Sequence, residues 1–364
     1  MSLKLNVLLP DGDSTWALSV LQCLSQTEGY KVFVLSNKKR TSTKYSKFTS
    51  YYKFYQRPSE AAWLDCINYE IEANSIDVVM PVAETEISFL IKNKHKVSQR
   101  AKVILLPELK NFETVINKNK LSDFAKSHGI PHPKSFHITT EVEKEAVLSV
   151  VNFPLLIKPL SEKGGDGIEK IISKEQFPKH IAQPLFIQEY IEGYDIDCSV
   201  LCQNGKVLTH TIQKGNLKGD SIFAPQLGLD FLDCDEVLKI AIDTMSKLNW
   251  SGVAHLDLRY DEIAKEYKLI EINARFWGSV EASRVAGINF PDISIQLALG
   301  EIIEHQAYNH ISYMRLKGVL KEIKSHPSFI FKRKYLMNNT ETKTVLSDPL
   351  PTMYKFREWL GRQF

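Results

Sequence analysis

The chain has 364 residues, of which 43% are hydrophobic and 24% charged, with a formal net charge of +3. This composition is typical of a soluble globular protein, and the length favours two or three packed units over one core. The small net charge gives no reason to expect a nucleic-acid partner, and no apolar run approaches the ~20 residues of a membrane span. The start, MSLKLNVLLPDGD, fits a first strand better than a signal peptide. Five dispersed cysteines favour buried free thiols and a cytoplasmic location.

Residues 1–110 have the pattern of an α/β unit. Apolar strand segments alternate with helical spacing, with strands expected at 3–9, 31–36, 76–82 and 101–107 and helices at 14–27 and 59–73. Such alternation predicts a parallel sheet. The loop at 10–16 holds one glycine, so it lacks the G-x-G-x-x-G pattern of a dinucleotide site. Because ligands of open parallel sheets bind at the carboxyl ends of strands, we expect this loop and the Glu84-Thr85-Glu86 turn to border a cleft.

The pattern changes after residue 110, where strands and helices mix. We expect helices at 117–133, ending at Gly129, and at 234–248, with strands at 153–160, 168–173, 185–191, 196–202, 206–212, 252–260 and 267–276. This predicts an α+β part over 111–305, and residues 306–364 are expected to form an extension packed on the body.

Two basic segments have alternative interpretations. The stretch 316–336 is interpreted as a surface helix and strand, with contact to a membrane or nucleic acid as the alternative. The aromatic and basic run 44–58 is interpreted as a loop and an edge strand, with single-stranded nucleic acid as the alternative.

The most specific chemistry lies on two neighbouring strands. Alternation places one polar face on each of them, formed by His255, Asp257 and Arg259 on the first and by Leu269, Glu271, Asn273 and Arg275 on the second. If the hairpin turns near Ala264, Asp257 lies opposite Glu271. Opposed carboxylates repel and a divalent cation removes that repulsion, so these acids with Asn273 predict a Mg²⁺ site, with Mn²⁺ as the other candidate ion. A solvated polar face in another register is the alternative.

A glycine loop follows another strand. In IKPLSEKGGDGI (157–168), Lys158 precedes Gly164, Gly165 and Gly167, and the backbone N–H groups of such a loop can approach phosphate oxygens. The pattern is not the G-x-x-x-x-G-K-[ST] P-loop, and an ordinary turn is the alternative.

A third segment, LFIQEYIEGYDID (185–197), has the features of a nucleotide-binding edge. The strand edge around residues 189–191 can offer backbone groups to an adenine, and Asp195 can accept bonds from ribose hydroxyls. Acids flanking a surface turn are the alternative.

In order and spacing, these segments resemble the ATP-grasp superfamily over about 115–300, and the unit before them looks like the corresponding domain of carbamoyl phosphate synthase and biotin carboxylase. The resemblance implies an α/β domain followed by an ATP-grasp domain pair. It also implies residue roles: nucleotide lysines Lys118 (or its neighbour Lys120) and Lys158, a phosphate-covering loop with Gly164, Gly165 and Gly167, an adenine hinge at Glu189, Tyr190 and Ile191, the ribose acid Asp195, metal ligands Asp257, Glu271 and Asn273, and Arg275 facing the transferred phosphate. Asp257 stands where many relatives have Glu or Gln.

The function implied by the resemblance is ATP-dependent ligation. ATP with Mg²⁺ would activate a small carboxylate as an acyl phosphate, and an amine would then displace phosphate. A homodimer is expected, and neither nucleic acid nor a membrane is expected as a partner. A phosphotransferase on the same scaffold and a non-catalytic nucleotide-binding regulator are the alternatives. Arg259 and Arg284 are candidates to hold the carboxylate, and His210 and Lys214 are candidates to face the cleft.

Overall fold

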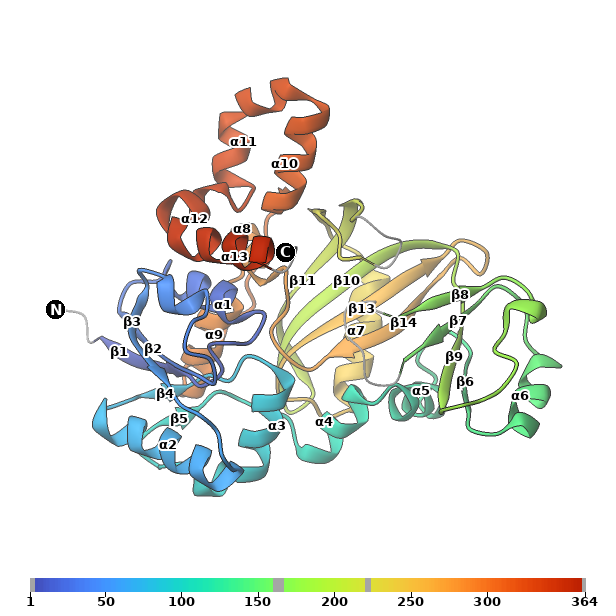
Figure 1. Ribbon diagram of the computed structural model, residues 1–364, viewed down its shortest axis with the longest axis horizontal. Helices are drawn as coiled ribbons and strands as arrows, with labels where there is room; N and C mark the ends of the chain where they lie inside the picture. The colour runs from blue at the N-terminus through green and yellow to red at the C-terminus, as the bar shows by residue number, and fades with distance from the viewer. Residues whose placement is uncertain (1–3, 160–166, 220–223, 362–364) are drawn as a thin grey trace.

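The computed structural model describes residues 4–159, 167–219 and 224–361, which form three sheets and a helical C-terminal extension (Figure 1). The predicted fold class, a parallel α/β unit followed by an α+β pair, is confirmed. In Figure 1 the first and second sheets lie on opposite sides of the third.

The first sheet is entirely parallel. Its strands run in the order β3 (Thr49–Phe54), β2 (Tyr30–Ser36), β1 (Leu5–Leu9), β4 (Val78–Val79) and β5 (Lys102–Val103). The helices of this unit are α1 (Ala17–Leu24), α2 (Glu60–Ala73) and α3 (Glu84–Asn93), with short 3-10 turns at Thr43–Tyr45 and Lys94–Lys96. The run 44–58 supplies β3 at the sheet edge, as expected. Parallel strands bury both faces, which explains the continuous apolar sequence LNVLL of β1.

The second sheet is small and antiparallel. Its order is β6 (Ser135–Ile138), β9 (Leu185–Glu189), β7 (Leu155–Lys158) and β8 (Glu169–Ile171). Helices α5 (Lys118–Ser127) and α6 (Glu141–Leu148) contact β6, and α4 (Leu109–Ile116) packs against α5; a 3-10 turn lies at Lys174–Gln176. The side chain of Thr140 caps α6 and Glu143 completes a capping box, so this helix starts where its sequence specifies.

The third sheet is the largest and is also antiparallel. Its order is β14 (Glu266–Asn273), β13 (Gly252–Asp261), β10 (Gly193–Gln203), β11 (Lys206–Leu217), β12 (Gly228–Phe231) and β15 (Ser312–Met314). Helix α7 (Asp235–Lys247) covers one face, and the predicted free cysteines Cys198 and Cys202 are buried in the same core. Helices α8 (Val280–Ala286) and α9 (Phe290–Ala298) contact α1 and join this sheet to the first unit.

A β-bulge changes one expected face of β14. Asp257 pairs with Glu271 as predicted, but Leu258 pairs with Leu269, which leaves Ile270 as the extra residue. An inserted residue shifts the alternation of side chains by one position. Leu269 is therefore in the core, 2% exposed, instead of beside Glu271, and Ile270 lines a cavity.

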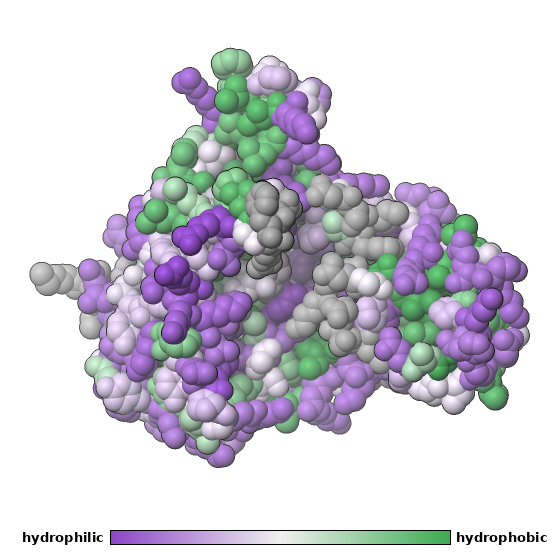
Figure 2. Space-filling model, in the orientation of Figure 1, coloured by the Kyte–Doolittle hydropathy of each residue, from purple (hydrophilic) through white to green (hydrophobic). Residues whose placement is uncertain are grey.

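The C-terminal extension is helical. It contains α10 (Leu316–Ser325), a 3-10 turn at Pro327–Phe331, α11 (Arg333–Asn338), α12 (Thr342–Ser347) and α13 (Pro349–Gly361). The strand expected within 316–336 is wrong, because Phe329 packs with Val319 and Leu336 in a small core that helical turns bring together. Apolar residues gather on this extension in the space-filling view (Figure 2).

The extension contacts the first unit. Asp348 accepts hydrogen bonds from the Ser46 hydroxyl at 2.5 Å and from the Lys47 N–H at 3.1 Å.

Within the described ranges, no helix combines the length and apolar character needed to cross a membrane.

Candidate active site

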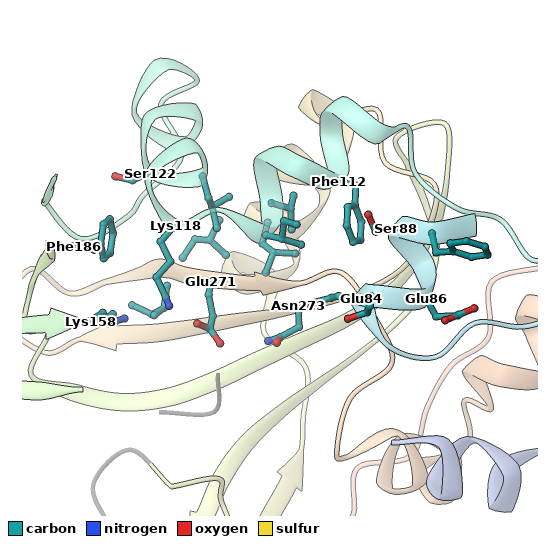
Figure 3. A pocket seen from close by; sticks show the side chains of 18 of the residues that line it. Glu84, Glu86, Ser88, Phe112, Lys118, Ser122, Lys158, Phe186, Glu271 and Asn273 are labelled. Atoms are coloured by element: carbon teal, nitrogen blue, oxygen red, sulfur yellow. The ribbon is translucent and has the colours of Figure 1, made fainter. Parts of the chain in front are cut away.

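Two cavities meet at β14, and together they are lined by most of the predicted site residues. The larger has a volume of about 690 Å³ and the smaller about 310 Å³. The residues that line both are Lys158, Gln188, Ile270, Glu271 and Asn273. Figure 3 shows Lys118, Lys158, Glu271 and Asn273 along the larger cavity, with Glu84 and Glu86 beyond them. The expectation that this acidic turn borders the cleft is confirmed.

The predicted metal ligands lie together because of the strand register. Asp257 is directly opposite Glu271, and the Asn273 side-chain amide donates to Asp257 Oδ2 at 3.2 Å. Arg275 in turn donates to Asn273 Oδ1 at 2.5 Å and orients the amide. Burial, followed by the charge of Glu271, raises the pKa of Asp257 well above its usual value. Two crowded carboxylates with an amide oxygen suit Mg²⁺, whose charge would remove their repulsion.

Asp197 and His255 extend this acidic cluster. Asp197 pairs with Asp257 across β10 and β13, and His255 Nε2 lies 3.2 Å from Asp257 Oδ1 and 3.9 Å from Asp197 Oδ2. Burial raises the pKa of Asp197 to about 7, and burial lowers the pKa of His255 to about 3, so the imidazole is neutral. The sequence placed His255 on the polar face without a role and missed Asp197. The alternation of Asp195 and Asp197 along one strand was the available signal.

The two predicted lysines approach the shared wall from different elements. Lys158 is buried at the end of β7; burial lowers its pKa, and the nearby Glu271 charge opposes that shift. Lys118, at the start of α5, lines the larger cavity and donates to the Pro159 carbonyl at 2.7 Å. The alternative Lys120 is exposed and lies 4.0 Å from Glu113. The structure therefore favours Lys118 over Lys120 as the residue facing the cleft.

The glycine loop is only partly described. Gly164 and Gly165 lie outside the described residues. Gly167 has φ +71°, a conformation that L side chains rarely adopt. A Cβ at Gly167 would lie 3.1 Å from the Pro159 ring.

The expected adenine hinge lines the smaller cavity. Glu189 ends β9, Tyr190 and Ile191 follow it, and Asp195 lies on β10. Arg259 holds this turn, donating from Nε to the Ile191 carbonyl at 2.7 Å and pairing with the Asp195 carboxylate. These bonds engage its guanidinium, so Arg259 supports the hinge in this structure.

Gly193 sits inside the same turn for a steric reason. A Cβ at this residue would lie 1.9 Å from the Tyr260 carbonyl oxygen, and Arg259 also donates to the Gly193 carbonyl at 2.8 Å. Only glycine fits such a close approach of two backbones.

The opposite end of the smaller cavity contains residues that sequence reasoning missed. Trp16, from the loop after β1, and Arg315, from the start of the extension, both line it close to Arg275. Arg315 donates to the Gly278 carbonyl at 3.1 Å, and Arg275 Nε lies 3.6 Å from Glu84 Oε1. Arg315 is forty residues beyond Arg275, and no local pattern connects the two.

Three other residues that the sequence offered as possible substrate contacts lie away from the two cavities. Arg284 is 3.8 Å from Glu281 on α8, the His210 ring packs 5.7 Å from that of His305, and Lys214 lies over the Tyr194 ring at 3.5 Å. None of the three is among the described residues that line the two cavities.

Sequence comparison identifies related chains. A sequence model of the family described as "ATP-grasp in the biosynthetic pathway with Ter operon" matches residues 182–321. The carbamoyl phosphate synthase large chain of Thermomicrobium roseum is 24% identical over 213 residues, covering 53% of this chain and 19% of the relative. The C-terminal section of the carbamoyl phosphate synthase large chain from Methanopyrus kandleri is 24% identical over 305 residues, covering 76% of this chain and 53% of the relative. The chain thus spans about half or less of the length of these relatives.

Solved structures share the fold. N5-carboxyaminoimidazole synthetase from Staphylococcus aureus, in complex with ADP, superposes with a TM-score of 0.69 and 13% identity over 90% of this chain and 87% of that one. Biotin carboxylase from Campylobacter jejuni superposes with a TM-score of 0.64 and 16% sequence identity, covering 82% of this chain and 71% of that one. L-amino acid ligase from Bacillus licheniformis superposes with a TM-score of 0.60 and 19% sequence identity, covering 83% of this chain and 75% of that one. At these identities, the likeness establishes the fold alone.

Proposed function

We propose that this chain is an ATP-grasp protein that uses Mg-ATP to couple a carboxylate to an amine, releasing ADP and phosphate. The observation that carries the proposal is the opposition of Asp257 and Glu271 where the two cavities meet, with Lys158 and Arg275 beside them. This arrangement concentrates the positive and negative groups that phosphoryl transfer needs in one place.

ATP would occupy the smaller cavity from the hinge toward Lys158. The adenine would lie against the hinge at Glu189, Tyr190 and Ile191, and the ribose would lie near Asp195. The phosphates would then point toward Lys158, with Lys118 on the adjoining wall. Buried ammonium groups near Glu271 are suited to bind phosphate oxygens in place of water.

The acidic residues provide the metal site for this nucleotide. Asp257, Glu271 and Asn273 would hold Mg²⁺, and their crowding supports the assignment, since without a cation their charges repel. A bound ion supplies positive charge that offsets the charge developing on the transferred phosphoryl group.

The first step forms an acyl phosphate. One oxygen of the substrate carboxylate attacks the γ-phosphorus, the bond to the bridging oxygen breaks, and ADP leaves with the electron pair. Both Arg275 and Arg315 line this cavity, and we propose that Arg275 faces the transferred phosphate while Arg315 holds the carboxylate. A guanidinium matches a carboxylate with two parallel hydrogen bonds. Fixing the reactants in this way supplies much of the acceleration.

The second step forms the amide. The amine nitrogen attacks the carbonyl carbon of the acyl phosphate, the carbon–oxygen bond to phosphate breaks, and the departing phosphate accepts the proton from nitrogen. This route needs no nucleophilic side chain. Trp16 and Trp277 form apolar walls near the reacting end, which helps to exclude water from a reactive intermediate.

Product analysis tests the proposal directly. The protein would be incubated with Mg-ATP and a panel of small carboxylates, with and without amines, and ADP, phosphate and products would be measured. Amine-dependent release of ADP and phosphate together with an amide supports ligation. A stable phosphorylated product formed without amine identifies a phosphotransferase, and nucleotide binding without ADP release identifies a regulator.

Two further expectations accompany the proposal. The five free cysteines, four of them buried, are consistent with a cytoplasmic location. We also propose a homodimer, which size-exclusion chromatography with light scattering would test.

A further inference from the structure

The cluster of Asp197, His255 and Asp257 has the geometry of a metal site. Adjacent strands pair Asp197 with Asp257, and His255 lies two residues before Asp257, so all three side chains share one face. One ligand atom from each residue lies within 4.8 Å of the other two. Ligand atoms bonded to one ion at about 2.1 Å are separated by about 3 to 3.5 Å, so small side-chain adjustments would close the site.

The imidazole is held in a direction suited to binding an ion. Ser199 Oγ and His255 Nδ1 are 2.8 Å apart, and the ring stacks on Trp277 with a 5.3 Å centroid separation and a 9° interplanar angle. These contacts aim Nε2 at the two carboxylates. Metal-binding histidines are commonly oriented by a hydrogen bond to their other nitrogen.

Gln213 provides a second, independent observation. Its side chain is 1% exposed and its amide nitrogen donates to Asp197 Oδ2 at 3.2 Å and to Ser279 Oγ at 2.7 Å. Its Oε1 has no hydrogen-bond partner among the residues that the structure describes. Buried polar atoms are normally paired, so this amide, which already contacts Asp197 through its nitrogen, has an oxygen that needs a donor from a bound group or water.

We infer that Asp197, His255 and Asp257 bind a divalent transition-metal ion, in preference to Mg²⁺, at a position beside the nucleotide metal site. The carboxylates select a divalent cation, and the imidazole nitrogen favours a transition metal, since Mg²⁺ prefers oxygen ligands alone. Asp257 belongs to both positions, whereas Glu271 and Asn273 belong to the nucleotide side. The inference concerns ion binding by the protein without nucleotide, so it stands apart from the proposed ligation.

Direct ion binding tests this assignment. Mn²⁺ would be titrated into the full chain without ATP, and free Mn²⁺ would be followed by electron paramagnetic resonance, with Mg²⁺ as the competitor. We expect wild type to bind Mn²⁺ about tenfold or more tightly than Mg²⁺. Equal affinities, or no Mn²⁺ binding at millimolar concentration, would overturn the inference without the need for any variant.

Variants separate the two positions. We expect His255→Asn and Asp197→Asn each to weaken Mn²⁺ binding about tenfold or more, and Glu271→Gln to have a much smaller effect. His210→Asn is the matched control, because His210 and His255 are both 8% exposed and His210 lies outside the cluster.

The variants also exclude a simpler role for the imidazole. If His255 only donates a hydrogen bond to Asp257, its variant keeps Mn²⁺ binding and the inference is wrong. Co²⁺ gives a second readout, since its visible absorption bands change when an imidazole ligand is lost. Asp197→Asn keeps the test decisive if the His255 variant does not fold. A failed ligation assay with intact Mn²⁺ selectivity would count against the proposed function alone.

Discussion

Asp257 lies directly opposite Glu271 in the register of β13 and β14, and the two acids both line the smaller cavity. Because opposed, partly buried carboxylates repel, this pair costs stability unless a cation binds between them. A bound cation would remove this cost, and for this reason we propose the two acids as metal ligands.

Replacing one of these acids tests the metal assignment. Glu271→Gln is isosteric and removes a charged ligand, so we expect Mg-dependent ADP release to fall by about a hundredfold or more while the fold is retained. Glu266→Gln, at the exposed start of the same strand, is the matched control. Wild-type rates in the Glu271 variant, with an unchanged circular dichroism spectrum, would remove Glu271 from the site.

The buried lysine should matter for nucleotide binding. Lys158→Ala removes an ammonium from the shared wall, so we expect most of the thermal stabilisation by Mg-ATP to disappear. Lys120→Ala, exposed and outside both cavities, should keep the wild-type shift. Equal ATP-induced shifts in the two variants would show that Lys158 does not contact the nucleotide.

Arg315 is the residue proposed to hold the carboxylate from the C-terminal extension. Arg315→Ala should raise KM for the carboxylate about tenfold or more, the effect of losing one charged hydrogen-bonding pair, while ATP binding stays the same. The exposed Arg333→Ala, on the same extension, is the control for a general change in charge. An unchanged KM for the carboxylate would remove Arg315 from the substrate end.

Glu281 links the extension to α8 and makes stability depend on pH. Burial raises the pKa of Glu281 from its usual 4.5 to about 7, and the Thr344 hydroxyl donates to its carboxylate. The folded chain therefore keeps a proton that the unfolded chain releases at lower pH. The stability that this proton contributes is present below pH 4.5 and is lost as pH rises through 7.

Glu281→Gln tests this linkage. The variant removes the buried charge, so it should gain stability over wild type between pH 5 and pH 8, by at most about 3 kcal/mol. Urea unfolding at several pH values measures the difference. If wild type and variant change in parallel with pH, Glu281 does not carry the effect.

Local patterns were sufficient to predict much of the fold and the pairing of Asp257 with Glu271. The pairing of Asp257 with Glu271 follows from the side-chain alternation along β13 and β14 and from the length of the turn between them. In a hairpin, the length of the turn sets which residues pair. The bulge at Ile270 was not predictable, since one extra residue leaves no signal in an apolar strand.

Local sequence patterns did not predict the cavity-lining residues that come from distant segments of the chain. Trp16 and Arg315 reach the substrate end only after α8 and α9 pack on α1 and the extension turns back toward the body. The support that Arg259 gives to the hinge was also missed, because its partners, the Ile191 and Gly193 carbonyls, are backbone atoms without a sequence signature. The strand expected within 316–336 failed because tertiary packing around Phe329 outweighed local propensity.

Oxygen-isotope transfer tests the central claim most directly. The carboxylate that gives the highest amine-dependent ADP release would be labelled with ¹⁸O in its carboxyl group, and the released phosphate would be examined by mass spectrometry. Ligation through an acyl phosphate predicts one ¹⁸O atom in the phosphate and an amide product. Unlabelled phosphate, or phosphate release that does not depend on the amine, would contradict the account.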